Sequence, residues 1–299
     1  MKCSPFSNFE LKRKTKPSYI TSSALRGFIS LALKEDLGSG DHTSAACIPS
    51  SAKGRARLIV KDKGILAGVD LAKTIFSVID SKINFKELRS DGDKVKPGDI
   101  AFTVSGDQQN ILKAERLVLN CLQRMSGIAT KTHQLSEKIK RTKAGLLDTR
   151  KTTPGFRMLE KWAVHIGGGI NHRMGLYDMI LIKDNHVDFC GGIERAILQT
   201  RKYILKKKLK LKIEVEVRNE KELKEVLRTG GIDRILLDNM TPAEISKAVL
   251  MIDKRSVTEA SGGINSKNIL NYARTGVDLI SIGSLTHSYN SLDMSLKAY

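Results

Sequence analysis

Basic residues follow several short apolar segments in the second half of the sequence. Arg150 and Lys151 come after GLLDT, Lys183 ends MILIK, and His172 and Arg173 stand beside three glycines in HIGGGINHR. Glycine lets the backbone approach a ligand closely, and guanidinium groups bind planar carboxylates through two parallel hydrogen bonds. Because these cations come from separate segments, they predict a clamp for a planar anion. A solvent-facing basic turn is the alternative for Arg150 and Lys151.

Acidic residues follow the next two apolar segments. KIEVEV carries Glu214 and Glu216, and RILLDN carries Asp238 and Asn239. Magnesium prefers oxygen ligands, and waters and phosphate complete its coordination shell. We therefore predict that Glu216 and Asp238, at neighbouring strand ends, serve a magnesium-bound phosphate substrate. The alternative is that both form structural ion pairs with nearby lysines.

Glycine-rich segments come last in the chain. SVTEAS runs into Ser261, Gly262 and Gly263, and LISIGS ends at Gly283 and Ser284. Backbone N–H groups at helix N-termini bind phosphate readily, so these segments predict phosphate cradles, although short glycine pairs alone are weak signals. Cations, then carboxylates, then glycines make up the chemistry that an anion and a metal-bound phosphate would need.

The segments that carry these residues share one rhythm. GLLDTR, MILIKD, KIEVEV, RILLDN, SVTEAS and LISIGS are short apolar runs that end in polar residues and alternate with helical patterns. Such consecutive βα units predict parallel strands with helices outside them. Six or seven units predict a closed or nearly closed α/β barrel, in which reactive residues lie at the C-terminal ends of the strands.

A different pattern precedes the barrel. Apolar residues at helical spacing predict a helix over 24–35, and short alternating segments over 52–104 predict strands. We therefore predict three parts. These are a basic lead-in at 1–22, an N-terminal α/β domain at 23–130, to which the C-terminal segment can return, and a barrel domain at 131–299 that carries the active site.

The net charge of +19 raises the alternative of a nucleic-acid-binding protein. Much of the excess lies in the lead-in and in RKYILKKKLKLK at 201–212, which we interpret as solvated surface. Binding of single-stranded nucleic acid would need basic residues interleaved with aromatic ones. Aromatic residues make up only 5% of the sequence, so we expect an anionic small substrate and no nucleic acid.

The cysteines and the hydropathy bear on the compartment. Cys3, Cys47, Cys121 and Cys190 lie far apart and match neither a zinc site nor a disulfide framework. No apolar run approaches the roughly 20 residues needed to span a bilayer. The N-terminal residues lack the hydrophobic stretch of a secretory signal. We therefore expect a cytoplasmic protein with reduced thiols that does not bind membranes.

The order of the motifs resembles one enzyme family. EDLGSGDHT, AERLVLNCLQRMSGIAT, DTRKTTPGFR, KWAVHIGGGINHR, LIKDNH, EVEV, LLDN, EASGGI and SIGSLTHS occur with nearly the spacing found in quinolinate phosphoribosyltransferases. These enzymes are also called nicotinate-nucleotide pyrophosphorylases (carboxylating). The resemblance runs from about residue 24 to the C-terminus, and the lysine-rich segments fall outside every motif. It implies an open, incomplete α/β barrel joined to an N-terminal α/β sandwich domain.

The resemblance also implies a reaction of NAD biosynthesis. Quinolinate and phosphoribosyl pyrophosphate give nicotinate mononucleotide, pyrophosphate and carbon dioxide, with magnesium and no organic cofactor. The family works as a homodimer, so Arg116 would reach the site of the neighbouring subunit. By similarity, the residues that hold the two quinolinate carboxylates would be Arg116, Arg150, Lys151, His172, Arg173 and Lys183.

The second substrate has its own implied residues. Glu216 and Asp238 would bind the ribose hydroxyls and magnesium, directly or through substrate and water. The implied catalytic residues are Lys151, Glu216 and Asp238, and Thr149 joins the substrate-binding set. By similarity, the phosphates would be received by Ser261, Gly262, Gly263, Gly283, Ser284 and His287.

A phosphoribosyltransferase for nicotinate itself is the nearest alternative. Nicotinate has one carboxylate, whereas quinolinate has two. The surplus of cations around the predicted clamp favours the dicarboxylate.

Overall fold

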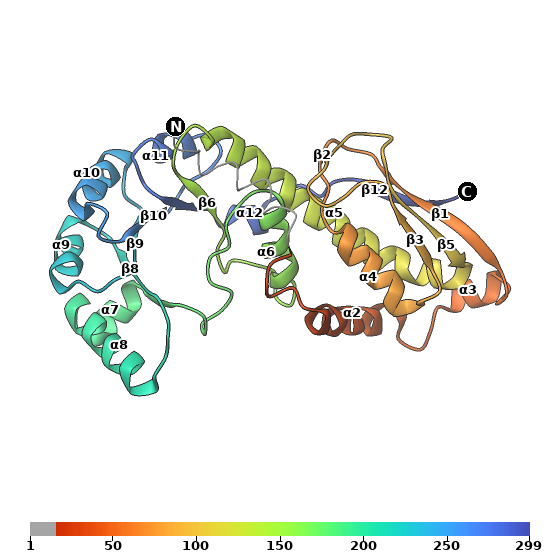
Figure 1. Ribbon diagram of the computed structural model, residues 1–299, viewed down its shortest axis with the longest axis horizontal. Helices are drawn as coiled ribbons and strands as arrows, with labels where there is room; N and C mark the ends of the chain where they lie inside the picture. The colour runs from red at the N-terminus through yellow and green to blue at the C-terminus, as the bar shows by residue number, and fades with distance from the viewer. Residues whose placement is uncertain (1–15) are drawn as a thin grey trace, which may run out of the picture. The chain divides into compact units, whose positions relative to one another are not determined.

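The computed structural model describes residues 16–299, so Cys3 and most of the lead-in predicted at 1–22 lie outside the described residues. The chain forms two compact units (Figure 1). Among the described residues, the first contains 16–133, 152–168 and 285–299, and the second contains 134–151 and 169–284.

The first unit is built on an antiparallel sheet of four strands in the order β12-β1-β5-β3. A separate two-stranded pair is formed by β2 and β4. The segments predicted as strands over 52–104 supply most of these strands, and the C-terminal strand β12 pairs with β1. The strand bounds are β1 (Lys53–Val60), β2 (Gly64–Ile65), β3 (Asn84–Glu87), β4 (Lys94–Val95), β5 (Ile100–Asp107) and β12 (Met294–Ala298).

Helices of the first unit begin where the sequence offers a cap. The side chain of Thr21 accepts a hydrogen bond from Ala24 N, so the helix predicted over 24–35 starts slightly earlier. Phe76 of α4 packs with Phe85 and Phe102 of the sheet, whose ring centroids lie 4.5 Å apart. The helices are α2 (Ser22–Leu37), α3 (His42–Cys47), α4 (Val69–Ile79), α6 (Arg157–Ile166) and the long α5 (Gln108–Ile139), which continues past residue 133.

The second unit contains a six-stranded sheet in the order β6-β11-β10-β9-β8-β7. Every pairing in it is parallel, and a single parallel bridge joins Ile170 to Leu147 of β6. β6 and β7 lie at the two edges, which confirms the predicted open α/β barrel. The strands are β6 (Gly145–Leu147), β7 (Ile180–Ile182), β8 (Ile213–Val217), β9 (Arg234–Asp238), β10 (Val257–Ser261) and β11 (Leu279–Ser281).

Helices lie on the outer side of this curved sheet (Figure 1). Several are started by their own side chains: Asn219 accepts from Glu222 N at the start of α9, and Thr241 and Glu244 form a capping box at α10. The helices are α7 (Asp184–Cys190), α8 (Ile193–Lys207), α9 (Glu220–Thr229), α10 (Pro242–Ile252), α11 (Ile269–Ala273) and the short α12 (Ser284–His287), which crosses the boundary between the units.

The strand register separates an apolar face from a polar one. Glu214 of β8 pairs with Arg234 of β9, and Leu236 pairs with Glu216 on one side and with Glu259 on the other. Side chains alternate between the two faces of a strand, so the acidic residues share a face with Arg234. The valines and isoleucines between them face the helices. The barrel interior therefore carries charged groups, which need partners when buried.

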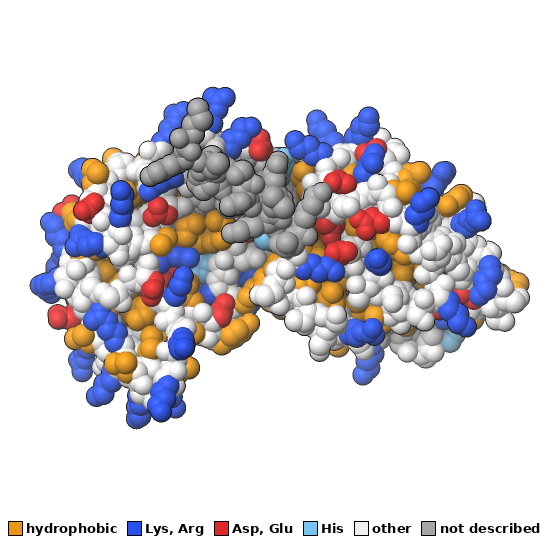
Figure 2. Space-filling view, in the orientation of Figure 1, with side chains coloured by type: hydrophobic (Ala, Val, Ile, Leu, Met, Phe, Trp, Pro, Cys, Tyr) orange, Lys and Arg blue, Asp and Glu red, His pale blue; other side chains and the backbone are white. Residues whose placement is uncertain are grey.

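Basic side chains are spread over both units. On the face shown in Figure 2, they alternate with acidic and neutral side chains. Every lysine in 201–212 is exposed, which confirms the prediction that this segment is solvated surface. Within residues 16–299, no helix combines the length and apolar character needed to cross a membrane.

Candidate active site

The predicted site residues collect at the carboxyl ends of the parallel strands. The two edge strands β6 and β7 lead into cations, and the central strands lead into carboxylates and glycines. Arg116 and His287 belong to the first unit instead, where both side chains are exposed. In sheet order the ends carry Thr149, Arg150 and Lys151 after β6, Gly283 and Ser284 after β11, Ser261–Gly263 at β10, Asp238 at β9, Glu216 at β8 and Lys183 after β7.

Lys183 and Glu216 join a predicted clamp cation to a predicted metal ligand. Lys183 Nζ donates a hydrogen bond of 2.6 Å to Glu216 Oε2. The Glu216 side chain is 7% exposed and that of Lys183 46% exposed. Burial, and then the charge of Glu216, raise the pKa of the Asp238 carboxyl group. Asp238 therefore lies close enough to Glu216 for their charges to interact, and Lys183 forms with Glu216 the kind of ion pair that the sequence left open as the alternative.

Arg173 and Arg150 form a second pair of like charges. Arg173 Nη1 donates to the backbone oxygen of Met179 at 3.1 Å, which fixes the guanidinium from one side. Burial, and then the charge of Arg150, lower the pKa of Arg173. The charges of Glu214 and Asp178 oppose this lowering, and two neighbouring guanidinium groups can together bind a further anion.

His172 takes a different place from the other predicted clamp residues. It is only 7% exposed, and its backbone N–H donates to Asp148 Oδ1 at 2.7 Å. Asn171 Nδ2 donates to the other oxygen of Asp148. The ring Nδ1 accepts a hydrogen bond of 2.7 Å from Arg173 N. The segment 171–173 is thereby held in one conformation by Asp148 and by its own histidine.

Glu214 and Glu259 lie behind His172, in the barrel interior. His172 Nε2 is 3.1 Å from Glu214 Oε2 and 3.7 Å from Glu259 Oε2. Arg234 Nη1 donates to Glu259 Oε2 at 3.0 Å and lies 3.8 Å from Glu214 Oε2. Burial, and then the charge of Glu214, raise the pKa of Glu259 to about 7. When two buried carboxyl groups lie this close to each other, one of them tends to keep its proton.

We expect the raised pKa of Glu259 to appear as a pH dependence of stability. Its ordinary pKa is 4.5, so between about pH 4.5 and 7 the folded protein binds this proton more tightly than the unfolded chain. The stability that the protonated Glu259 contributes is therefore present at low pH and is lost as the pH rises to about 7. Urea unfolding of wild type and Glu259→Gln at pH 5 and pH 7 should show the difference between their free energies of unfolding falling by ~2 kcal/mol. If the free energies of unfolding of the two proteins change equally between pH 5 and pH 7, the raised pKa of Glu259 is contradicted.

The first glycine segment differs from a simple helix N-terminus. Ser261 pairs with Asp238 in the sheet register, whereas α11 begins only at Ile269. Gly262 has a φ of +93°, and a Cβ there would lie 2.2 Å from Asn239 Oδ1. Only glycine fits this close approach. The second segment does lead directly into a helix, because Ser284 is the first residue of α12.

An ion pair missed by the sequence analysis anchors the rest of the DTRKTTPGF loop. Arg124 Nε of α5 donates to Glu160 Oε1 at 3.0 Å, and Thr153 N donates to Glu160 Oε2 at 3.1 Å. The guanidinium also lies 5.1 Å from the ring centroids of Phe156 and Tyr289. The sequence RMLEKWAVHI of α6 mixes charged and apolar residues, so the complete burial of Glu160 became visible only in the structure.

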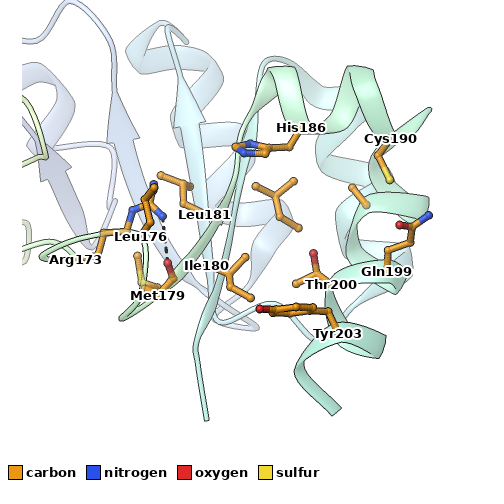
Figure 3. A pocket seen from close by; sticks show the side chains of 12 residues that line it. Arg173, Leu176, Met179, Ile180, Leu181, His186, Cys190, Gln199, Thr200 and Tyr203 are labelled. Atoms are coloured by element: carbon orange, nitrogen blue, oxygen red, sulfur yellow. Dashed lines mark hydrogen bonds between the residues drawn. The ribbon is translucent and has the colours of Figure 1, made fainter. Parts of the chain in front are cut away.

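A pocket of about 410 Å³ lies between β7 and α8. Figure 3 shows Arg173 and Met179 on one side and Gln199, Thr200 and Tyr203 of α8 on the other. Among the predicted site residues, only Arg173 lines it. The pocket therefore borders the cationic part of the site and does not contain the strand ends that carry the carboxylates and glycines.

The whole chain resembles known proteins. Residues 41–126 match the N-terminal domain and residues 128–297 the C-terminal domain of quinolinate phosphoribosyl transferase. A mitochondrial quinolinate phosphoribosyltransferase [decarboxylating] of Nicotiana tabacum is 42% identical, over 97% of this chain and 85% of its own. A probable nicotinate-nucleotide pyrophosphorylase [carboxylating] of Bacillus subtilis is 41% identical, over 88% of this chain and 89% of its own.

Solved structures agree with the sequences. The nicotinate-nucleotide pyrophosphorylase of Francisella tularensis has a TM-score of 0.87 at 36% identity, covering 94% of this chain and 98% of its own. Human nicotinic acid phosphoribosyltransferase has a TM-score of 0.58 at 11% identity, over 86% of this chain and 72% of its own. That second likeness concerns the fold alone. From its two matched domains and its close relatives, the chain belongs to the quinolinate phosphoribosyltransferase family.

Proposed function

We propose that this protein transfers the phosphoribosyl group of phosphoribosyl pyrophosphate to quinolinate and releases pyrophosphate and carbon dioxide. The product is nicotinate mononucleotide, a precursor in NAD biosynthesis. The observation that carries the proposal is the order of groups along one sheet edge. Arg150 and Arg173 lie near β6, and Glu216 and Asp238 lie on β8 and β9 beside the glycines of β10.

The cations position quinolinate. Arg150, Arg173 and Lys183 would hold its two carboxylates, with Lys151 and Arg116 completing the clamp. A ring held in this way presents its nitrogen to the anomeric carbon, and the new C–N bond forms as pyrophosphate leaves. The resulting pyridinium nitrogen accepts the electron pair of the adjacent C–C bond, so that carboxylate departs as carbon dioxide and a proton replaces it.

Magnesium belongs to the same proposal. Glu216 and Asp238 are the residues we propose to hold it, because carboxylate oxygens suit magnesium and because the charge of Glu216 raises the pKa of Asp238. When bound, the ion offsets the charge that develops on the leaving pyrophosphate. Glu216 and Asp238 would also accept hydrogen bonds from the ribose hydroxyls, while Ser261–Gly263, Gly283, Ser284 and His287 would receive the phosphates.

We also propose a cytoplasmic homodimer with sites shared between subunits. The described cysteines Cys47, Cys121 and Cys190 are free thiols, as expected in a reducing compartment. Arg116 is exposed on α5 of the first unit and could serve a partner's site. Cell fractionation of the full-length protein and its mass in solution test these two points.

The reaction itself is tested with purified protein. Phosphoribosyl pyrophosphate and magnesium are supplied with quinolinate in one arm and with nicotinate in the other. We expect pyrophosphate release in the quinolinate arm, with an equal amount of carbon dioxide. Release with nicotinate alone, or release without carbon dioxide, would overturn the proposal.

Asp238→Asn tests the division of the site between the substrates. We expect binding of phosphoribosyl pyrophosphate with magnesium to weaken about tenfold or more, the size of one charge-assisted contact. The quinolinate affinity should change less than twofold in the same variant. Isothermal titration of each ligand separately measures both values.

Asp253→Asn is the matched control for this change. Asp253 is an exposed C-cap residue of α10 with a φ of +45°, a conformation that asparagine also tolerates. It should bind both ligands as wild type does. Equal weakening of both ligands in Asp238→Asn would indicate a structural role for Asp238 instead.

A further inference from the structure

The buried group formed by His172, Glu214, Glu259 and Arg234 is not explained by direct substrate contact. One atom each of His172, Glu214 and Glu259 lie within 4.8 Å of one another, as in a metal site. A metal would need the lone pair of His172 Nε2. However, Nδ1 already accepts a hydrogen bond from Arg173 N, which assigns the proton of the neutral ring to Nε2. The ring therefore presents a donor to the two carboxyl groups, and the geometry argues against a metal.

The carboxyl groups favour this tautomer. Glu214 Oε2 and Glu259 Oε2 lie 3.1 Å and 3.7 Å from Nε2, so a bare lone pair at Nε2 would face acidic oxygens in the barrel interior. With the proton at Nε2, Nδ1 is free of hydrogen and can accept from Arg173 N. In the opposite tautomer, the N–H at Nδ1 would point at the N–H of Arg173. The lone pair of Nε2 would then face the carboxyl oxygens, and both arrangements are unfavourable.

Arg234 donates a hydrogen bond to Glu259 and forms an ion pair with Glu214. It lies opposite Glu214 in the strand register, and its guanidinium reaches Glu259 at 3.0 Å and Glu214 at 3.8 Å. Glu214 and Glu259 are both fully buried, and their positions on β8 and β10 are set by the sheet. The sheet interior thus determines where the ring of His172 stands, and the ring determines where Arg173 N stands.

We propose that Glu214, Glu259 and Arg234 are positioning residues that act through the ring of His172 to hold Arg173 for quinolinate binding. This inference rests on the proposed function, since Arg173 is assigned there to a quinolinate carboxylate. It gives His172 a role in supporting Arg173 in addition to its predicted place in the carboxylate clamp. Arg173 is then held at its backbone N–H by His172 Nδ1 and at its guanidinium by Met179 O.

Two substitutions of His172 separate support from direct contact. In His172→Asn, the amide oxygen takes roughly the place of Nδ1 and can still accept from Arg173 N. In His172→Gln, the amide reaches the place of Nε2 and leaves Arg173 N without its acceptor. We expect KM for quinolinate to rise about tenfold in His172→Gln, the order of one lost buried hydrogen bond, and less than threefold in His172→Asn. KM for phosphoribosyl pyrophosphate should stay within twofold in both.

Several outcomes would overturn the proposal. Equal losses in the two variants would mean that the ring itself touches quinolinate. Parallel rises in KM for both substrates would mean a general structural defect. Arg228→Lys, an exposed change on α9 with a side chain 73% exposed, controls for substitution as such, and thermal unfolding of each variant checks folding.

The tautomer gives a readout that does not depend on activity. In a ¹⁵N-histidine-labelled sample of the full chain, the resonance missing from His172→Asn identifies His172. We expect a neutral ring with its proton on Nε2 in wild type. In Glu214→Gln/Glu259→Gln, whose amides can donate as well as accept, we expect a mixture of tautomers and a raised KM for quinolinate. A proton on Nδ1 in wild type would overturn the positioning role. If wild type shows the expected tautomer but does not convert quinolinate, the proposed function fails and not the network.

Discussion

Replacing Arg173 by lysine is expected to lower kcat/KM for quinolinate by about a hundredfold. Arg173 already uses one N–H in the bond to Met179 O, so its remaining donors are aimed by a planar group that is anchored at one end. A lysine ammonium is a point charge on a flexible stem and cannot hold both the backbone oxygen and a carboxylate in a fixed plane. Loss of two charge-assisted hydrogen bonds accounts for about 3 kcal/mol, which corresponds to that factor.

Steady-state kinetics with each substrate varied in turn measure this effect. Most of the loss should appear in KM for quinolinate, because the carboxylate is bound before and during the reaction. The Arg228→Lys protein should keep wild-type kinetics, since that side chain is exposed on α9. A loss in Arg173→Lys below about fivefold would count against a direct carboxylate contact.

Arg116→Ala and Arg150→Ala proteins are each expected to be nearly inactive, yet active when mixed. Arg116 lies in the first unit and Arg150 in the second. If each site of a two-fold dimer takes Arg116 from one chain and Arg150 from the other, every hybrid dimer contains one site with both defects and one site with neither. Random exchange makes about half of the dimers hybrids, so activity should recover to roughly a quarter of that of wild type.

The mixing experiment needs proof that subunits exchange. Native mass spectrometry of one isotope-labelled parent with the other unlabelled measures the hybrid fraction. The matched control mixes Arg150→Ala with Arg173→Lys, whose defects lie in the same unit. Those hybrids should gain nothing, because each keeps one defect in each site. If Arg116 and Arg150 hybrids form and activity stays at the level of the parents, the shared site is wrong.

The barrel strands could be predicted because each is encoded locally. RILLD is a short apolar run that ends in an acidic residue, KIEVEV alternates apolar and acidic residues, and Asn219 and Thr241 mark the starts of the next helices with their own side chains. The prediction that reactive residues follow these strands needs no more than the parallel arrangement. For that reason Lys183, Glu216 and Asp238 could be placed at one sheet edge from the sequence.

The role of His172 could not be predicted in the same way. Its neighbours in the sequence are glycines and Arg173, which indicate an anion site. Its neighbours in space are Glu214 and Glu259, from strands far along the chain. Two glutamates two residues apart in KIEVEV do show that Glu214 shares a face with Glu216, but nothing local shows that this part of the face is buried against a histidine.

The sequence by itself determined the fold class, the family and the set of polar groups at the strand ends, because hydrophobic periodicity and capping act over a few neighbouring residues. The tertiary structure decided which groups meet. The order β6-β11-β10-β9-β8-β7 and the pairing of β12 with β1 join segments that are distant in the chain. Strand order and register arise from packing of the whole sheet, and burial follows from them. Lys183 therefore meets Glu216, and a pair of carboxyl groups comes to lie behind His172, through contacts that no local pattern records.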